Sequence, residues 1–272
     1  MTARSMRVAL LLLFIALSAQ VSRAADNKIV LTGSSTVAPL VAEIGKRYEE
    51  RHPGVRVDVQ AGGSSRGISD ARSGLADIGM VSRALEADEG DLRAFQIARD
   101  GIGIIVHGSN RVGALSDTQI VAIYTGKVHD WREVGKASGP ITVVSKAEGR
   151  STLELFMHYF KLKASDIKAS VVIGDNQQGI KTVAGAPSAI GYVSIGAAEY
   201  EIGAGTPIRL LGIGGAAASI ENVRNGSYPL SRPLNLVTKA APSGRVKDFI
   251  AFAQSDAVRD IVTEQFFVPV GP

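Results

Sequence analysis

The chain of 272 residues contains no cysteine. This absence excludes a disulfide framework and a thiol for lipid attachment, so we expect the protein not to be a lipoprotein. Histidine is also scarce, and the sequence has neither a cluster of metal-ligating residues nor a Walker A phosphate loop. Hence no metal centre or nucleotide site is expected. No run of residues approaches the roughly 20 apolar positions that a membrane-spanning helix needs.

The N-terminus has the pattern of a secretory signal peptide, expected to comprise residues 1–24. Arg4 and Arg7 precede an apolar run from Val8 to Leu17, and residues 22 and 24 are small, as cleavage requires. We therefore expect the protein to be exported. Together with the lack of cysteine, this pattern fits a Gram-negative periplasm best.

Little net charge remains once that segment is removed. The formal charge of the whole chain is +4, from 30 basic and 26 acidic residues. Three arginines and no acidic residue lie in the signal segment, so the exported chain has 27 basic and 26 acidic residues, about +1. Nucleic-acid binding depends on a strongly basic surface and is therefore not expected.

Glycine and serine gather in one stretch, Ala61–Arg83, with the sequence AGGSSRGISDARSGLADIGMVSR. Residues Val55–Gln60 before it alternate as a strand does, and Ile68–Ser73 predicts a short helix that ends at a glycine. Ser64 or Ser65 would then cap this helix. Because a helix N-terminus presents unpaired N–H groups, these hydroxyls predict a cradle for a small oxyanion.

Two more strand-to-helix loops carry the same residue types. The first, Ser34–Thr36, follows an apolar strand, and the second follows a strand at Ile141–Val144. In the second loop, Lys146 and Arg150 add positive charge beside Ser151-x-x-Glu154, which predicts a capping box. Because the carboxyl ends of parallel strands meet at one edge of a sheet, we expect the first loop to lie beside the glycine-serine stretch.

Strands and helices alternate along the chain, which predicts an α/β protein. Two strands, Ile102–Val106 and Leu234–Val237, are candidates for crossings between two lobes. The lobes would then be residues 26–105 with 233–272, and residues 106–232. In this arrangement the loop with Lys146 faces the other two hydroxyl loops across a cleft.

Asp77 interrupts the otherwise apolar strand Ala76–Val81. An unpaired charge in such a strand would be costly, so the carboxylate needs a partner, and a protonated ligand is one candidate. The alternative is a structural role, in which Asp77 pairs with Arg83 or caps a loop.

A hydrolase is the second function that these residues leave open. Gly63-Ser64-Ser65-Arg66-Gly67 fits the G-x-S-x-G nucleophile elbow and lies between a predicted strand and helix, as that motif requires. A hydrolase using Ser65 would need an acid and then a histidine, for which Asp130 and His158 are the candidates. Nothing in the sequence marks His158 as catalytic, so oxyanion binding is favoured.

Several motifs together resemble the periplasmic phosphate-binding proteins of ABC transporters, and the resemblance covers essentially the whole exported chain. The motifs are Gly33-Ser-Ser-Thr-Val-Ala-Pro39, Gly63-Ser-Ser-Arg-Gly67, Asp77-Ile-Gly-Met-Val-Ser-Arg83, Ile123-Tyr-Thr-Gly-Lys with Trp131, Ile190-Gly-Tyr-Val193 and Tyr228-Pro-Leu-Ser-Arg-Pro233. The resemblance implies a two-lobed type II periplasmic binding protein fold of the α/β class, with two crossing strands as the hinge. It also implies a monomer without cofactor or metal, which binds inorganic phosphate or a similar oxyanion and works with the membrane subunits of an ABC transporter.

The resemblance also implies a set of ligand contacts. Carried over by position, these are Ser35, Thr36, Ser64 and Asp77 in the first lobe, and Lys146, Arg150, Ser151 and Thr152 in the second. The second set departs from the family pattern, which has arginine where Lys146 stands and Ser-Gly-Thr where Arg150-Ser151-Thr152 stand. A lysine cannot make the bidentate fork of an arginine, although Arg150 offers a guanidinium nearby. Sulfate, molybdate or a similar oxyanion therefore remains open, as does an accessory or regulatory relative.

On this assignment Asp77 would select phosphate over sulfate. An ionised carboxylate accepts a hydrogen bond from a protonated phosphate but only repels a fully deprotonated sulfate.

Overall fold

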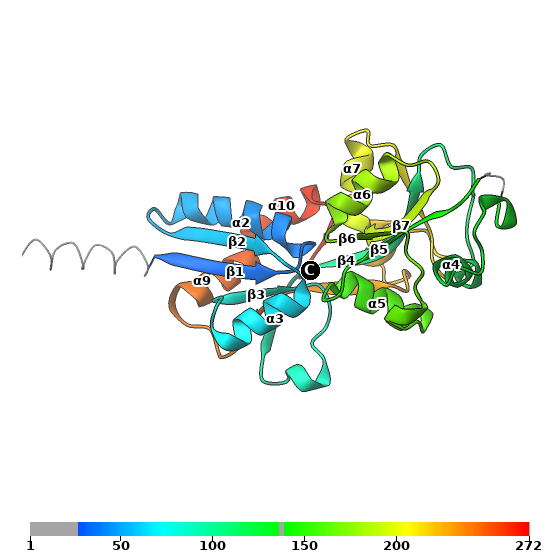
Figure 1. Ribbon diagram of the computed structural model, residues 1–272. Coiled ribbons are helices and arrows are strands. Elements are labelled where there is room, and N and C mark those ends of the chain that lie inside the picture. Colours follow the sequence, from blue (N-terminus) through cyan, green and yellow to red (C-terminus); the bar gives the residue numbers. More distant parts are fainter. Residues whose placement is uncertain (1–26, 136–138, 272) are drawn as a thin grey trace, which may run out of the picture.

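The structure is a computed structural model that describes residues 27–135 and 139–271. The expected signal peptide lies outside these residues. The described chain forms two lobes, which lie to the left and right of the centre of Figure 1. Within these residues no helix is both long and apolar enough to cross a membrane.

The first lobe combines the N-terminal and C-terminal parts of the described chain. Its elements are β1 (Lys28–Gly33), α2 (Val37–Arg51), β2 (Arg56–Ala61), α3 (Ser64–Ser73), β3 (Ile78–Val81), β9 (Ser231–Thr238), α9 (Gly244–Ala253), α10 (Arg259–Glu264) and β10 (Val268–Pro269). β1 runs parallel to both β2 and β3, whereas β9 runs antiparallel to β3. Leu40, Val41 and Ile44 recur at helical spacing in α2 and are buried in the core of this lobe.

The second lobe is formed by the middle of the chain. Its elements are α4 (Asp117–Tyr124), β5 (Thr142–Lys146), α5 (Ser151–Phe160), β6 (Val171–Ile173), α6 (Asn176–Ala184), β7 (Ala189–Ser194), α7 (Ile195–Gly203), β8 (Ile208–Leu211) and α8 (Ile220–Arg224). β5 runs parallel to β6 and β7. Phe156 of α5 stacks on Tyr192 of β7 with ring centroids 4.0 Å apart, which fixes α5 on the sheet.

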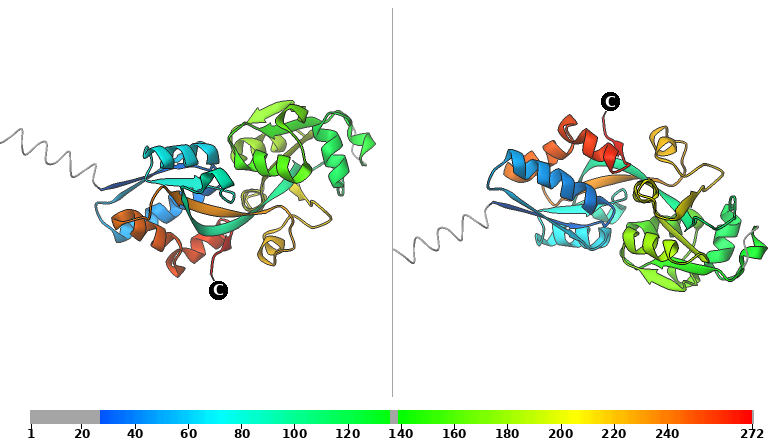
Figure 2. Two further views of the ribbon diagram at one scale, coloured as in Figure 1. Left: turned by 90° about the horizontal axis from the view of Figure 1, so that it is seen from below. Right: turned by 90° about the horizontal axis from the view of Figure 1, so that it is seen from above.

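Strand β4 (Arg93–His107) joins the two lobes. Its first part pairs antiparallel with β9 as far as Gly101, and from Ile102 onwards it pairs antiparallel with β7. The strands of the described residues thus form one sheet, in the order β2-β1-β3-β9-β4-β7-β5-β6, with β8 and β10 also paired to β4. Figure 2 shows β4 and β9 side by side where the chain passes between the lobes. The two expected crossing strands lie within β4 and β9, while the lobe boundaries themselves stay a prediction.

The helix starts differ in part from the prediction. Ser64 and Ser151 are the first residues of α3 and α5, the N-cap positions belong to Gly63 and Arg150, and neither helix has a side-chain cap. The expected serine caps of these two helices are therefore wrong, because both hydroxyls take part in other hydrogen bonds. A capping box does form at α4, where Ser116 Oγ accepts from the N–H of Gln119 at 3.2 Å and the Gln119 side chain accepts from the N–H of Ser116 at 2.9 Å.

Candidate functional site

Three buried serines lie at the carboxyl ends of the parallel strands of the first lobe. Ser34 follows β1, Ser64 begins α3 after β2, and Ser82 follows β3. Ser34 Oγ donates to Ser82 Oγ at 2.9 Å, and the N–H of Ser82 donates to Ser64 Oγ at 3.2 Å. The parallel sheet therefore brings the first two hydroxyl loops together, as the sequence predicts.

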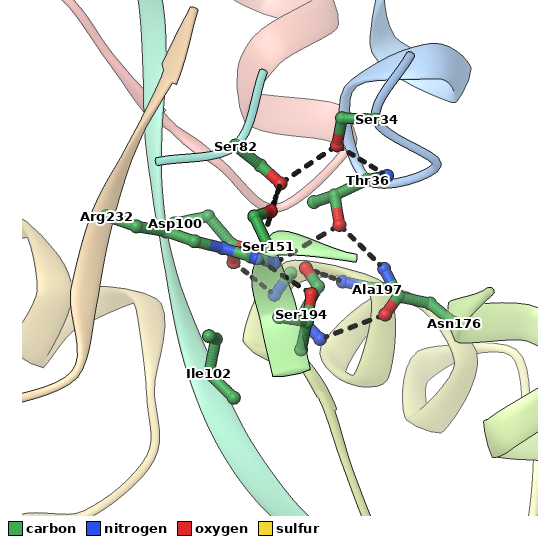
Figure 3. A network of polar contacts seen from close by, with 12 residues as sticks. Ser34, Thr36, Ser82, Asp100, Ile102, Ser151, Asn176, Ser194, Ala197 and Arg232 are labelled. Atoms are coloured by element: carbon green, nitrogen blue, oxygen red, sulfur yellow. Dashed lines mark hydrogen bonds and ion pairs between the residues drawn. The ribbon is translucent and has the colours of Figure 1, made fainter. Parts of the chain in front are cut away.

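The start of α5 brings the third loop against these serines. Ser64 Oγ donates to Ser151 Oγ at 3.0 Å, and the Oγ atoms of Ser82 and Ser151 lie 2.6 Å apart. Figure 3 shows Ser82 between Ser34 of the first lobe and Ser151 of the second. We call the following buried side chains the hydroxyl cluster: Ser34, Thr36, Ser64, Ser82, Ser151 and Thr152.

Backbone groups also converge on this cluster. The N–H groups of Thr36 and Val37 donate to Ser34 Oγ at 3.2 and 3.3 Å, and α2, α3 and α5 all begin here. The N-termini of the helices carry partial positive charge, which favours an anion. Gly33 has φ of 131°, and a Cβ at this position would collide with the carbonyl oxygen of Met80. Glycine therefore lets the first loop lie close to β3.

Arg232 of β9 supplies buried positive charge. Its side chain is 1% exposed and forms an ion pair with Asp100 of β4, in which Nη2 and Oδ2 are 2.8 Å apart. Nη1 also donates to Thr152 Oγ1 at 2.8 Å and to Ser82 Oγ at 3.4 Å, while Nη2 donates to Thr36 Oγ1 at 3.2 Å. Asp100 therefore holds one side of the guanidinium, and the other side faces the hydroxyl cluster.

Lys146, at the end of β5, is a second buried cation. Its Nζ donates to Asn176 Oδ1 at 3.0 Å, and Asn176 Nδ2 donates to Thr36 Oγ1 in the other lobe at 3.1 Å. Burial lowers the pKa of Lys146 to about 7, and the positive charges of Arg232 and Arg150 act in the same direction. Near neutral pH the amine is thus balanced between its charged and neutral forms, and a nearby anion would favour the charged form.

Arg150 and Ser35 complete the lining of the cavity between the lobes. Arg150 Nε is buried and has no hydrogen-bond partner among the described residues. The Arg150 side chain packs against Gly63 of the other lobe, since a Cβ added to Gly63 would lie 3.2 Å from Arg150 Nη1. The cavity has a volume of about 10 Å³, which is room for about one water molecule. The lobes are therefore closed on one another, and their hydroxyls bond directly across the cleft.

Glu154 of α5 links the lobes beside this cavity. Its Oε1 accepts from Ser65 Oγ at 3.0 Å, and its Oε2 accepts from Arg83 Nε at 2.9 Å. Arg83 also donates to both carboxylate oxygens of Glu89, at 2.7 and 2.8 Å, and this pairing raises the pKa of Arg83 above its ordinary value. Both oxygens of Glu154 are thus occupied by groups of the first lobe.

Asp77 does not lie at this cluster, so its expected role as a ligand contact is wrong. The residue is exposed, and its Oδ2 accepts from the N–H of Val30 at 2.7 Å. Asp77 precedes β3 whereas Ser82 follows it, and five residues of extended chain separate them by about 16 Å. The carboxylate therefore has a local structural role, although its partner is a backbone N–H of β1 and not Arg83.

The arrangement expected of a serine hydrolase is not formed by the described residues. The hydroxyl of Ser65 bonds to Glu154 and to no histidine. His158 is exposed on α5, and Asp130 pairs with Arg132 at 2.8 Å. Nor do the described residues contain a group of three or more histidine, aspartate or glutamate side chains placed to hold a metal ion.

Four polar residues of the site are not among the predicted ligand contacts, namely Ser34, Ser82, Asn176 and Arg232. Ser82 had a detectable signal, because it follows a strand just as the other hydroxyl loops do. Asn176 begins α6 directly after β6 and shares that position. Arg232 stands alone before the apolar run of β9, where an unpaired charge would be costly.

Comparisons with known proteins agree with this architecture. Residues 18–257 match a family described as the PBP superfamily domain. The phosphate-binding protein PstS of Bacillus subtilis (strain 168) is 29% identical over 258 residues, covering 93% of this chain and 84% of that protein. A putative phosphate ABC transporter substrate-binding protein with bound phosphate from Clostridium perfringens superposes with a TM-score of 0.81 at 33% identity, covering 90% of this chain and 100% of that one. An ABC-type phosphate transport receptor from Vibrio cholerae gives a TM-score of 0.72 at 28% identity, covering 89% and 100%. The chain therefore belongs to the PBP superfamily, in the family of type II periplasmic phosphate-binding proteins.

Proposed function

We propose that this protein captures inorganic phosphate between its two lobes in the periplasm and delivers it to the membrane subunits of an ABC transporter. The observation that carries the proposal is the hydroxyl cluster, to which both lobes contribute and which the buried cations Lys146 and Arg232 flank. An oxyanion presents acceptor oxygens in several directions, and hydroxyls, basic groups and helix N-termini that converge from two sides are donors suited to it. The names of the similar proteins from Bacillus subtilis and Clostridium perfringens support phosphate as the ligand.

The ligand contacts follow from the same geometry. We assign Ser35, Thr36, Ser64, Lys146, Arg150, Ser151 and Thr152 to the ligand, as the sequence predicts, and add Ser34, Ser82 and Arg232. An anion that enters the cleft would replace the direct hydroxyl bonds between the lobes, such as that between Ser64 and Ser151. Since each lobe would then bind the same anion, phosphate should shift an open–closed equilibrium towards the closed form.

Calorimetry on refolded, phosphate-free protein tests this function. We expect one phosphate to bind per chain without turnover. Ser151→Ala should weaken binding by about tenfold, the loss of one hydrogen bond to a charged group. Ser73→Ala is the matched control, because the Ser73 hydroxyl is exposed on α3 and bonds only to backbone oxygens of its own helix. A chain that binds molybdate or an organic phosphate but not inorganic phosphate would contradict the proposal.

The absence of catalysis is part of the proposal and has a separate test. The hydroxyl of Ser65 is hydrogen-bonded to the carboxylate of Glu154, which also accepts from Arg83, and not to a histidine as in a catalytic triad. We expect no hydrolysis of ester substrates. An esterase activity that disappears in Ser65→Ala would place the protein among the enzymes.

A further inference from the structure

The cavity between the lobes is lined by hydroxyls, basic groups and a glycine, and by no carboxylate of the described residues. The lining consists of Ser34, Ser35, Thr36, Gly63, Ser64, Ser82, Lys146, Arg150, Ser151 and Thr152. With Asp77 at the far end of β3, the group expected to distinguish a protonated from a deprotonated anion is missing from the lining. The selectivity of the site must therefore come from other groups.

Asp100 and Glu154 are two carboxylates close to the cluster, and both already accept hydrogen bonds from other groups. Asp100 Oδ2 accepts two hydrogen bonds from Arg232, at 2.8 and 3.1 Å, and Oδ1 accepts from the N–H of Gly196 at 3.2 Å. The guanidinium of Arg232 lies between Asp100 and the hydroxyls, as Figure 3 shows. Both oxygens of Glu154 are likewise taken by Ser65 and Arg83. Neither carboxylate lines the cavity, and these hydrogen bonds direct both of them towards other groups.

Hydroxyl groups do not distinguish the two kinds of anion. A hydroxyl both donates and accepts, and its hydrogen rotates to suit the partner. Near neutral pH phosphate keeps at least one proton and needs one acceptor, whereas sulfate needs donors only. A cluster of hydroxyls satisfies either anion, because rejection of sulfate requires a group that can only accept.

Ser82 occupies the central position in this cluster. Its Oγ lies 2.9 Å from Ser34 Oγ, 2.6 Å from Ser151 Oγ and 3.4 Å from Arg232 Nη1. A side chain at residue 82 therefore reaches both lobes and the buried guanidinium. An acceptor-only group at this position would face any anion held between the lobes.

The buried charges also suit a divalent anion regardless of its protonation. Lys146, Arg150 and Arg232 supply three basic groups around the cavity, and Asp100 offsets one of them. When all three are charged they outnumber the neighbouring carboxylates Asp100 and Asp175, and this excess of positive charge attracts hydrogen phosphate and sulfate alike.

From these observations we propose that Ser82 determines the ligand class of the site, and that its hydroxyl makes the protein a receptor for tetrahedral divalent oxyanions, sulfate as well as phosphate. The inference rests on the proposed function, since it assigns the anion to the same cavity. The contact geometry selects the tetrahedral shape and the charge of the anion. It does not select the presence of a proton on the anion.

Competition calorimetry at pH 8 tests this inference. In the phosphate-free wild-type protein, the dissociation constants of phosphate and sulfate should lie within about tenfold of each other, a difference below about 1.4 kcal/mol. In Ser82→Asp, Arg232 can pair with the new carboxylate, one of whose oxygens faces the anion. The ratio should then rise more than about a hundredfold in favour of phosphate, because sulfate has no proton to donate to the carboxylate oxygen that faces it and is repelled by the like charge. Ser82→Asn has the same size without the charge and should leave the ratio near that of the wild type.

The wild-type ratio decides the matter even if Ser82→Asp fails to fold. Selection of phosphate over sulfate by more than about a hundredfold in the wild type would overturn the inference and leave the proposed function intact. An unchanged ratio in folded Ser82→Asp would also overturn it. Sulfate binding without phosphate binding would overturn both the inference and the proposed function.

Discussion

Replacing Lys146 by methionine should stabilise the ligand-free protein, and more so at low pH. Lys146 is 5% exposed, and burial lowers its pKa from 10.5 to about 7. Methionine fills a similar volume without a charge that must be desolvated. Its partner Asn176 is not left without a donor, because Asn176 Oδ1 also accepts from the N–H of Ser194 at 3.4 Å.

The size and sign of this effect follow from proton linkage. Below pH 7 the lysine is charged in both states, so the folded protein carries the full cost of the buried charge. At about 1.4 kcal/mol per pH unit, the drop from 10.5 to about 7 corresponds to an upper limit of about 5 kcal/mol. Between pH 7 and 10.5 the unfolded chain binds more protons than the folded one, so the free energy of unfolding rises with pH. At pH 9 about 3 kcal/mol of the cost should already be relieved.

Urea unfolding of phosphate-free protein at pH 6 and pH 9 measures this effect. The gain in stability of Lys146→Met over the wild type should be about 3 kcal/mol larger at pH 6 than at pH 9. Lys181→Met is the matched control, because Lys181 is exposed on α6, and its gain should not depend on pH. If the gain of Lys146→Met were equal at the two pH values, Lys146 would not be a charge held unfavourably in the folded state.

Three further predictions concern selectivity and closure. Asp77→Asn should leave the ratio of the phosphate and sulfate dissociation constants unchanged, because Asp77 is exposed and accepts a hydrogen bond from β1. A changed ratio in competition calorimetry would show that Asp77 acts on the ligand. Gly63→Ala should weaken phosphate binding by about tenfold or more, because the new Cβ would lie 2.5 Å from Gly149 O in the other lobe. Gly74→Ala is the control, because Gly74 also has positive φ but its added Cβ would have no atom within 4 Å; this variant should lose stability and keep its phosphate affinity. If both variants lost affinity equally, backbone strain and not the contact with Gly149 would be the cause. Glu154→Gln weakens the link between the lobes, so small-angle scattering of the ligand-free variant should give a larger radius of gyration than the wild type, and an unchanged value would contradict this role.

The sequence predicts the fold and much of the site because those parts depend on local patterns. Strand-to-helix loops with hydroxyls can be recognised one at a time, and the parallel sheet brings Ser34 and Ser64 together. The prediction for Asp77 fails because it rests on the cost of a charge in an apolar strand and not on position, since Asp77 precedes β3 and the hydroxyl loops follow the carboxyl ends of the strands. Arg232 was missed for a different reason, since its partner Asp100 lies 132 positions away and only the pairing of β4 with β9 makes them neighbours.

The ion pair of Arg232 with Asp100 lies on β9 and β4, the two strands that join the lobes. The positive charge that we assign to the anion is therefore held at the connection between the lobes. The two residues face each other across β4 and β9, and Asp100 lies two positions before Ile102, where β4 begins to pair with β7. Because β4 and β9 connect the lobes, a small rotation at this pair displaces the distant ends of the lobes by a larger amount. A small shift of the guanidinium towards an anion would therefore move the two lobes relative to one another. Recognition and movement would then share one pair of side chains. A substitution at Arg232 would then change both the affinity for the anion and the extent of closure.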